Sequence, residues 1–420
     1  MYATFLYLQN HRYWNYEETE TNSAIKFIKG EDSMTILSFL KGLNKKIRIA
    51  KKADFSRPIE EQMRFLGSLN PPQDDFARSY NQYKCQCFLR GKLICCFINM
   101  ASIPVFYFLK HRYSKSDFNK DDEKEVDAVF LRDGMNRSVL PVSLSVRFPL
   151  LIDEGDQRYH LSDNDCIFLG ELKRAYPLSY EFLLKALIKI ARYSSIIDRY
   201  SPKALIVCNE YSFTSSLLRK FCERNGVELI NVMHGEKILC IHDAFFHFDE
   251  CFVWHDHYRK LFTKLKAEDT QFRVELPPML SMELPKVGDK VQYDFTYYLG
   301  LDTERELRLI FENLSRLTEK GFKVAIRPHP RYTNFEMVEN LLSKSSGIDL
   351  EDFKIITIEQ SICNTKAVIS KMSTVLLQAL FAGKEVVIDD VTVPDQYLKL
   401  KNMDYIILNV KHRLLSNVLR

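Results

Sequence analysis

The residues best suited to chemistry form the run Arg327-Pro-His329-Pro330-Arg331, which follows an apolar segment typical of a strand, 322–326. Arginine guanidiniums match the geometry of phosphate oxygens. A histidine between them can hydrogen-bond or protonate a departing phosphate, and the prolines stiffen the loop by fixing backbone φ angles. The run therefore predicts a phosphate-binding loop at the carboxyl end of a strand.

A second phosphate-binding feature is predicted at Ser373 and Thr374, between an expected strand, 367–370, and an expected helix, 374–381. Free N–H groups and the dipole at a helix N-terminus favour an anion. Serine and threonine are also common N-caps, which is the plainer interpretation. Gly300, after the expected strand 293–299, lets the backbone approach a ligand or forms an ordinary turn.

Two further segments offer a general base for an acceptor hydroxyl. Asp153 and Glu154 end a strand-like segment and precede a glycine, and His234 follows another such segment and also precedes a glycine. The alternative for each is a turn residue in a satisfied hydrogen-bond network.

Metal and cofactor patterns are weak. Asp163-Asn-Asp165 matches the three-residue acidic pattern of metal-dependent sugar transferases, and four histidines lie between 242 and 257. The cysteines lack the paired spacing of a zinc site. We expect no metal and no cofactor. No GxGxxG or GxxxxGK[ST] motif is present, which argues against dinucleotide oxidoreductases and P-loop NTPases.

Strands alternate with helices along most of the chain, which predicts parallel sheets with crossover helices. The expected strands are 128–131, 150–153, 204–208, 229–233, 251–254, 293–299, 322–326, 353–357, 367–370, 384–388 and 405–408. A proline-rich interruption at 277–289 predicts two domains, 1–280 and 281–420. The fold class is α/β: two Rossmann-like, doubly wound domains facing a central cleft, with ligands beyond the carboxyl ends of the strands.

Composition bounds the class of protein. The 420 residues are 46% hydrophobic and 27% charged, with a formal net charge of +4, as in a globular enzyme. This charge is far from that of a dedicated nucleic-acid binder. Several of the ten cysteines lie in apolar runs, which favours reduced thiols and a cytoplasmic location.

One uncharged run, 93–109, lies between Lys92 and Lys110. It is shorter than the roughly 20 residues that a spanning helix needs. It predicts a buried element or, alternatively, a membrane-surface patch.

The order His-Gly, then Arg-Pro-His-Pro-Arg, then Ser-Thr before a helix resembles a group of bacterial transferases with the GT-B fold. The group comprises sialyltransferases of capsule and lipooligosaccharide synthesis, polysialyltransferases, Kdo transferases and teichoic-acid polyol-phosphate transferases. The resemblance covers roughly residues 200 to 400. It implies a cytidine nucleotide donor, with the shared motifs binding its CMP part.

The resemblance also implies roles for single residues. His329 would assist departure of the donor phosphate, and Ser373 and Thr374 would hold it. Asp153 and Glu154 match the acidic pair in which sialyl enzymes place their base, whereas His234 matches the proposed base of the polyol-phosphate enzymes. The base therefore stays open, with sialyl transfer ranked first because the acidic pair is present and no extra membrane-targeting domain is evident.

The expected function is an inverting, metal-independent transfer of sialic acid from CMP-sialic acid to a surface-polysaccharide or lipooligosaccharide acceptor. The first domain would bind the acceptor, and the second would bind the nucleotide sugar through Gly300, Arg327, Pro330, Arg331, Ser373 and Thr374. CMP-Kdo transfer and CDP-polyol phosphotransfer are alternatives. A non-catalytic nucleotide-binding partner in a polysaccharide assembly complex is an alternative of another class. Expected partners are the CMP-sugar donor and a glycan or glycolipid, with peripheral contact at the inner membrane and no nucleic acid.

Overall fold

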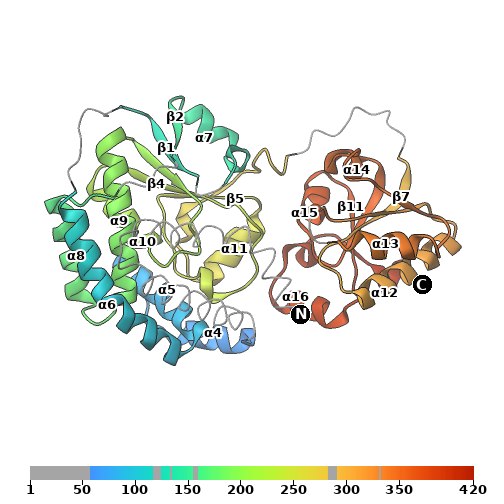
Figure 1. Ribbon diagram of the computed structural model, residues 1–420, viewed down its shortest axis with the longest axis horizontal. Helices are drawn as coiled ribbons and strands as arrows, with labels where there is room; N and C mark the ends of the chain where they lie inside the picture. Colours follow the sequence, from blue (N-terminus) through green and yellow to red (C-terminus); the bar gives the residue numbers. More distant parts are fainter. Residues whose placement is uncertain (1–56, 117–123, 133–134, 155–158, 282–290, 331–332) are drawn as a thin grey trace, which may run out of the picture. The chain divides into compact units, whose positions relative to one another are not determined.

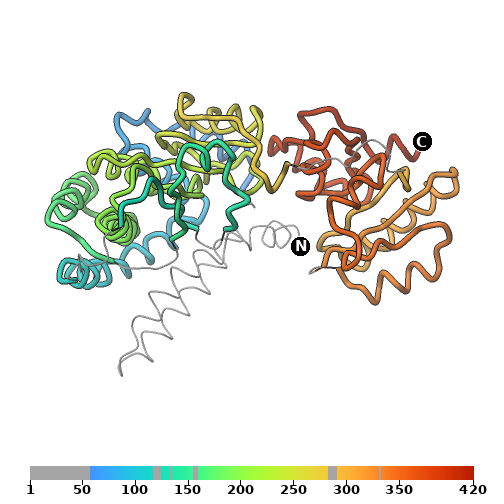
Figure 2. Tube along the Cα trace, turned by 90° about the horizontal axis from the view of Figure 1, so that it is seen from above, coloured from blue at the N-terminus to red at the C-terminus, as the bar shows by residue number. Residues whose placement is uncertain are grey.

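The computed structural model describes residues 57–116, 124–132, 135–154, 159–281, 291–330 and 333–420. The chain divides into two compact units: Met1–Gly235 with Leu239–Glu275, and Glu236–Ile238 with Leu276–Arg420. They are the blue-to-yellow and the orange-to-red parts of Figures 1 and 2, and each is described by itself. The acceptor and donor roles expected of the two domains stay predictions.

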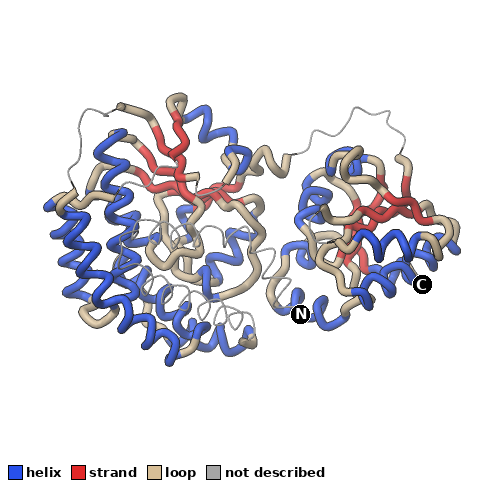
Figure 3. The backbone as a smooth tube through the Cα atoms, in the orientation of Figure 1, coloured by secondary structure: helices blue, strands red, loops and turns tan. Residues whose placement is uncertain are grey.

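The N-terminal unit is built on a parallel sheet of six strands in the order β2-β1-β3-β4-β5-β6. Figure 3 draws the strands in red. The strands are β1 (Ala128–Leu131), β2 (Leu151–Glu154), β3 (Ala204–Val207), β4 (Glu228–Val232), β5 (Glu250–Val253) and β6 (Phe272–Val274). The helices are α4 (Ile59–Ser68), α5 (Asp75–Arg90), α6 (Lys92–Ser114), α7 (Val142–Arg147), α8 (Asp163–Ala175), α9 (Tyr180–Tyr200), α10 (Ser215–Arg224) and α11 (Asp256–Lys264), with short 3-10 helices at Arg137–Val139, Ile241–Asp243 and Asp269–Gln271.

The strands of this sheet lie inside the unit because helices cover them. All four residues of β1 and of β3 are buried, as expected for parallel strands with apolar side chains on both faces. Helix α9 buries Phe182, Leu183 and Leu187 completely. These side chains recur at helical spacing, so one face of α9 forms part of the core.

The C-terminal unit has a second parallel sheet of six strands, in the order β12-β11-β10-β7-β8-β9. The strands are β7 (Tyr293–Tyr298), β8 (Val324–Arg327), β9 (Ile348–Leu350), β10 (Thr365–Ser370), β11 (Glu385–Ile388) and β12 (Arg413–Leu414). The helices are α12 (Glu304–Glu319), α13 (Phe335–Leu342), α14 (Ile358–Cys363), α15 (Thr374–Phe381), α16 (Pro394–Asn402) and α17 (Leu415–Val418), with a 3-10 helix at Ile406–Asn409. Two parallel α/β sheets confirm the predicted fold class, whereas the cleft between the units stays a prediction.

The order of the strands defines where each sheet changes direction. In the N-terminal unit the chain runs from β1 to β2 and then returns to β3, and in the C-terminal unit it runs from β7 to β9 and then returns to β10. Right-handed connections on the two sides of such a reversal place helices on both faces of the sheet. The loops after β1 and β3, and those after β7 and β10, diverge there, and ligands of doubly wound sheets bind at these points.

Two expected strands of the C-terminal unit are wrong. Segment 353–357 is not a strand: the strand β9 lies earlier, after Gly347 with its φ of +80°. Segment 405–408 lies mostly in the 3-10 helix Ile406–Asn409, and the final strand is β12. Both segments are short apolar runs, whose periodicity does not distinguish a strand from a helical turn.

Helix α6 contains the uncharged run between Lys92 and Lys110 and is longer than expected, at 23 residues. Among the described helices it alone is long and apolar enough to cross a membrane. Of its most apolar 18-residue stretch, 28% is buried inside the protein. A narrow stripe that includes Ile98 and Phe106 is buried, and α6 packs against α9. The opposite face exposes apolar side chains: Leu93, Phe97, Met100, Ile103, Val105, Tyr107 and Phe108.

Candidate functional site

Three predicted nucleotide-binding segments follow three neighbouring strands of the C-terminal sheet. Gly300 follows β7, His329 follows β8, and Ser373 follows β10, and β7 lies between the other two strands. Neighbouring strands are about 4.8 Å apart, so the ends of β8 and β10 are separated by about 10 Å. The structure therefore brings these segments to one edge of the sheet, beside the point where its strand order reverses.

The loops after β7 and β10 are joined by a buried lysine that the sequence analysis did not single out. The Nζ atom of Lys371 lies 2.6 Å from Asp302 Oδ1 and 3.2 Å from Glu306 Oε2. Burial alone would lower the pKa of Lys371, but the two carboxylates raise it above its usual value. Asp302 also accepts a hydrogen bond from the Gly300 N–H at 2.7 Å. These contacts fix the position of Gly300 relative to the start of α15.

Helix α15 begins with the predicted anion-binding pair. Ser373 is the N-cap, and its Oγ accepts a hydrogen bond from the N–H of Val375 at 3.2 Å. Thr374 is the first helical residue and is exposed. The serine hydroxyl thus has the capping role that was the plainer interpretation, while the helix N-terminus remains a favourable place for an anion.

Arg327 is buried and already paired. Its guanidinium donates to the Ile356 carbonyl at 2.7 Å and lies 3.4 Å from Glu351 Oε2, with the two side chains 7% and 1% exposed. Glu351 also accepts a hydrogen bond from Ser361. Arg327 therefore anchors the segment after β9 to the end of β8, and a nucleotide contact by it would require this ion pair to open.

His329 is half-buried and lies in a loop closed by Thr333, whose Oγ1 accepts a hydrogen bond from the His329 N–H at 2.7 Å. Pro330 is exposed. Arg331 lies outside the described residues. Among the described residues of the Arg-Pro-His-Pro-Arg run, His329 has a side chain that is both suited to proton transfer and accessible to a ligand.

Glu236 follows His234 by two residues and belongs to the C-terminal unit. Burial raises the pKa of Glu236 well above its usual value, and the neighbouring Tyr405 opposes this shift only in part. Tyr405 also interacts with the backbone of Ser373, so it lies between Glu236 and the start of α15.

In the N-terminal unit, Asp153 and Glu154 lie at the end of β2, the edge strand of the sheet. Asp153 Oδ1 accepts a hydrogen bond from Arg137 Nε at 2.7 Å, and its Oδ2 lies 3.8 Å from Arg132. Glu154 is buried and accepts a hydrogen bond from the hydroxyl of Tyr200 at 2.6 Å. Both carboxylates are thus engaged by side chains of their own unit.

His234 follows the central strand β4 and lies beside a buried carboxylate. Its Nδ1 is 3.6 Å from Oε1 of Glu210, and the two side chains are 3% and 0% exposed. Glu210 follows β3, at the point where the strand order reverses, and its other oxygen accepts a hydrogen bond from Asn231 at 3.1 Å. A carboxylate beside Nδ1 can orient an imidazole.

Neighbouring side chains hold this pair in place. The Nε2 atom of Gln82 donates to the Glu210 carbonyl at 3.0 Å, and that of Gln86 donates to the Tyr211 carbonyl at 2.8 Å. On the other side, Trp254 Nε1 donates to the carbonyl of Met233 at 2.9 Å. Sequence reasoning missed Glu210, which lies two residues beyond the expected strand 204–208 and lacks the following glycine that helped to single out Asp153 and Glu154.

The acidic pair and His234 cannot act on the same hydroxyl together. Strands β2 and β4 are three places apart in the sheet, which corresponds to about 14 Å at the usual strand spacing. The two candidates for the base therefore belong to two different places along the edge of the sheet.

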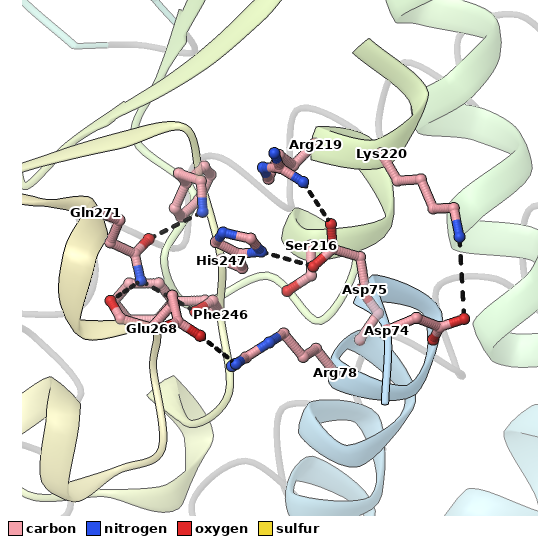
Figure 4. A network of polar contacts seen from close by, with 12 residues as sticks. Asp74, Asp75, Arg78, Ser216, Arg219, Lys220, Phe246, His247, Glu268 and Gln271 are labelled. Carbon is pink, nitrogen blue, oxygen red and sulfur yellow. Dashed lines mark hydrogen bonds and ion pairs between the residues drawn. The ribbon is translucent and has the colours of Figure 1, made fainter. Parts of the chain in front are cut away.

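The weaker metal patterns have structural roles among the described residues. Asp165 is part of the capping box that begins α8 and also accepts a hydrogen bond from Ser194 at 2.6 Å. His247 Nδ1 is 2.7 Å from Asp75 Oδ1, and Arg219 binds the same carboxylate at 2.9 Å (Figure 4). Burial opposes ionisation of Asp75, but these two partners lower its pKa. The contacts join α5, α10 and the segment before β5.

Comparisons with known proteins support the resemblance. Residues 293–388, which run from β7 to the end of β11, match the alpha-2,8-polysialyltransferase (POLYST) family model. No curated protein sequence matches the chain significantly. The family match supports a glycosyltransferase and is confined to the C-terminal unit.

Solved structures resemble the chain only distantly. UDP-GlcNAc 2-epimerase of Methanocaldococcus jannaschii has 11% identity over 70% of this chain and 90% of its own, with a TM-score of 0.38. The lipopolysaccharide outer core galactosyltransferase WaaB has 11% identity over 70% and 93%, also with a TM-score of 0.38. A putative UDP-N-acetylglucosamine 2-epimerase of Listeria monocytogenes has 11% identity over 65% and 82%, with a TM-score of 0.41. At this distance none of them bears on substrate or mechanism.

Proposed function

We propose that this protein is an inverting glycosyltransferase that transfers a sugar from a CMP-linked donor without a metal ion. Sialic acid is the first candidate for this sugar. The acceptor is a surface polysaccharide or a lipooligosaccharide. The observation that carries the proposal is the arrangement of Gly300, His329 and the α15 N-terminus on neighbouring strand ends, within the segment that matches the polysialyltransferase model.

The leaving group is CMP, and its phosphate takes the electron pair of the bond to the anomeric carbon. Backbone N–H groups at the start of α15 stabilise the resulting charge, and His329 donates a hydrogen bond or a proton to it. An acceptor hydroxyl attacks the anomeric carbon from the opposite side and gives its proton to a base. One bond forms as the other breaks, so the configuration inverts.

We infer that His234 is the first candidate for this base, ahead of Asp153, which the sequence favoured. Glu210 supports the imidazole from Nδ1, whereas an acceptor hydroxyl would have to displace Arg137 from Asp153.

The alternatives differ in the donor or in the chemistry. CMP-Kdo transfer would use the same phosphate features, and CDP-polyol phosphotransfer would use the same histidine base. A non-catalytic nucleotide-binding partner would keep the α15 site but would need no Glu210–His234 pair. Release of CMP from CMP-sialic acid that depends on an acceptor separates an enzyme from such a partner.

Thermal shifts with nucleotides test the donor class. CMP and CDP should raise the melting temperature of the protein, whereas UDP and GDP should have little effect, because the proposed site binds a cytidine nucleotide. Thr374→Val, which removes an exposed hydroxyl beside the helix N-terminus, should reduce the shift caused by CMP. Its matched control is Thr333→Val, which leaves α15 unchanged. Equal stabilisation by UDP would overturn the cytidine assignment.

We also infer that the exposed apolar face of α6 rests on an anionic membrane surface. Leu93 and Phe108 are 88% and 58% exposed, and α6 contains no acidic residue but carries Lys92, Lys110 and Arg112. Apolar side chains flanked by basic residues suit the interface of an acidic bilayer. A glycolipid acceptor would be presented at the same surface.

Vesicle flotation tests this contact. The protein should float with vesicles rich in phosphatidylglycerol and less with phosphatidylcholine alone. The double variant Leu93→Gln/Phe108→Gln should weaken binding by about tenfold or more, because each substitution removes apolar area that the bilayer would bury. Ile355→Gln, at a position that is 78% exposed in the other unit, is the control and should bind normally. Equal loss in both variants, or no binding to either vesicle, would contradict a membrane face on α6.

A further inference from the structure

Two cysteines with no role in the proposed transfer lie together at the junction of α5 and α6. Cys87 is in the last turn of α5 and Cys95 is in the first turns of α6. Between them Gly91 has a φ of +93°, a left-handed conformation that side-chain-bearing residues rarely adopt. This turn reverses the chain so that the two thiols and the carboxylate of Glu181 all lie within 4.8 Å of one another.

A buried guanidinium lies against the pair. Arg90 Nη2 is 3.6 Å from Cys87 Sγ, and Nη1 of the same residue pairs with Glu181. Cys95 Sγ is 3.6 Å from the Cys87 carbonyl. A hydrogen bond from Cys95 and the charge of Arg90 lower the pKa of the Cys87 thiol despite the opposing effect of burial. Cys87 is thereby favoured as the thiolate, and Cys95 keeps its proton.

These groups also resemble a metal site, since a thiolate pair and a carboxylate are zinc ligands. The guanidinium of Arg90 argues against this, because it already places a positive charge in contact with both Cys87 and Glu181. A second cation at that point would be repelled. A half-buried thiolate beside an arginine and a second thiol is instead the environment of a redox-active cysteine.

We propose that Cys87 and Cys95 form a reversible redox-active pair, in which a peroxide oxidises the two thiols to one disulfide. The Cys87 thiolate attacks a peroxide oxygen, the O–O bond breaks, and hydroxide leaves, giving Cys87 sulfenic acid. The Cys95 sulfur then attacks the Cys87 sulfur, and its proton leaves with the displaced hydroxide as water. The hydroxide released in the first step takes up a proton from solvent, so hydrogen peroxide is reduced to two waters, and a thiol such as dithiothreitol reverses the change.

The other cysteines nearby provide internal comparisons. Cys85 is completely buried, and burial raises its pKa to about 12, so it is a poor nucleophile. Cys96 follows Cys95 on α6 and is exposed, whereas Cys95 is buried. Reactivity toward peroxide should therefore follow the order Cys87, then Cys96, with Cys85 last.

Peptide mapping of the full-length protein tests the pair. Trypsin releases Cys85 with Cys87 in one peptide and Cys95 with Cys96 in another, so the double variant Cys85→Ser with Cys96→Ser serves as the background. After hydrogen peroxide and alkylation, this background should give the linked peptides, lose them with dithiothreitol, and lose them entirely when Cys87→Ser or Cys95→Ser is added. Circular dichroism confirms that each variant is folded.

Two results would overturn the proposal. One is the absence of the linked peptides at peroxide concentrations that oxidise Cys96 in the unmodified sequence. The other is tightly held zinc, at one equivalent per chain, that blocks alkylation of both thiols. Arg90→Gln should slow formation of the disulfide by about tenfold, with Arg112→Gln as a matched control, and equal rates in the two variants would remove the role assigned to Arg90.

Discussion

Replacing His234 with alanine should abolish sugar transfer while slow hydrolysis of the donor continues. Without a base, an acceptor hydroxyl is not deprotonated, so kcat for transfer should fall by about 10²-fold to 10⁴-fold. Water can still attack a bound CMP-sugar, because the groups that stabilise the leaving phosphate remain. The measurement is CMP release with and without acceptor, together with the amount of glycosylated product.

A substitution at Glu210 provides a second test of the role of His234. Glu210→Gln keeps the shape of the side chain but removes the charge that faces Nδ1 of His234. As a positioning residue it should lower kcat less than His234→Ala does, leave the KM for the donor nearly unchanged, and shift the pH profile of kcat. A purely structural role would instead lower the melting temperature without moving the pH profile.

The matched comparison uses two single variants, Asp153→Asn and Glu154→Gln. If His234 is the base, both variants should keep normal transfer. Loss of transfer in Asp153→Asn, with full activity in His234→Ala, would restore the acidic pair as the base and place catalysis at the edge of the sheet. If all three variants retain transfer, another residue is the base, and only the donor-site part of the proposal remains supported.

Replacing His329 with alanine should lower kcat by about 10²-fold or more, because the side chain acts mainly as charge develops on the leaving phosphate. Unlike His234→Ala, this substitution should slow transfer and hydrolysis together, since both reactions expel CMP. Binding of CMP, measured by thermal shift, should change little.

Thr333→Val is the control for loop structure at His329. It removes the hydroxyl that accepts the His329 N–H but leaves the imidazole in place, so its effect on kcat should be much smaller. Comparable losses in the two variants would mean that the shape of the loop matters more than the imidazole. Unchanged hydrolysis in His329→Ala would contradict the role of this residue at the leaving group.

The elements with explicit local signals were predictable from the sequence. The capping box Thr303-x-x-Glu306, a sequence signal for a helix N-terminus, begins α12, and Gly321 follows its end with a positive φ. Helix α15 also begins and ends at the residues expected from the sequence, 374 and 381. Such signals are local, because a cap or a glycine satisfies backbone groups within one turn of itself.

Features that depend on distant residues were not predictable. Strand β6 has two exposed residues among its three, so its sequence gives no apolar run, and it is defined by pairing with β5. Arg327 has the residue type of a phosphate ligand, but a glutamate 24 positions later turns it into a buried anchor. Glu210 is adjacent to His234 only because β3 and β4 are neighbours in the sheet.

The hydrogen bond from Trp254 to the Met233 carbonyl gives the protein an intrinsic optical reporter. The chain has two tryptophans, and replacing Trp14 with phenylalanine would leave Trp254 as the single strong emitter. Its indole is 4% exposed and is bonded to the residue directly before His234. Any ligand that shifts this turn would change the emission of a buried indole, so stopped-flow fluorescence could time events at the imidazole without a label.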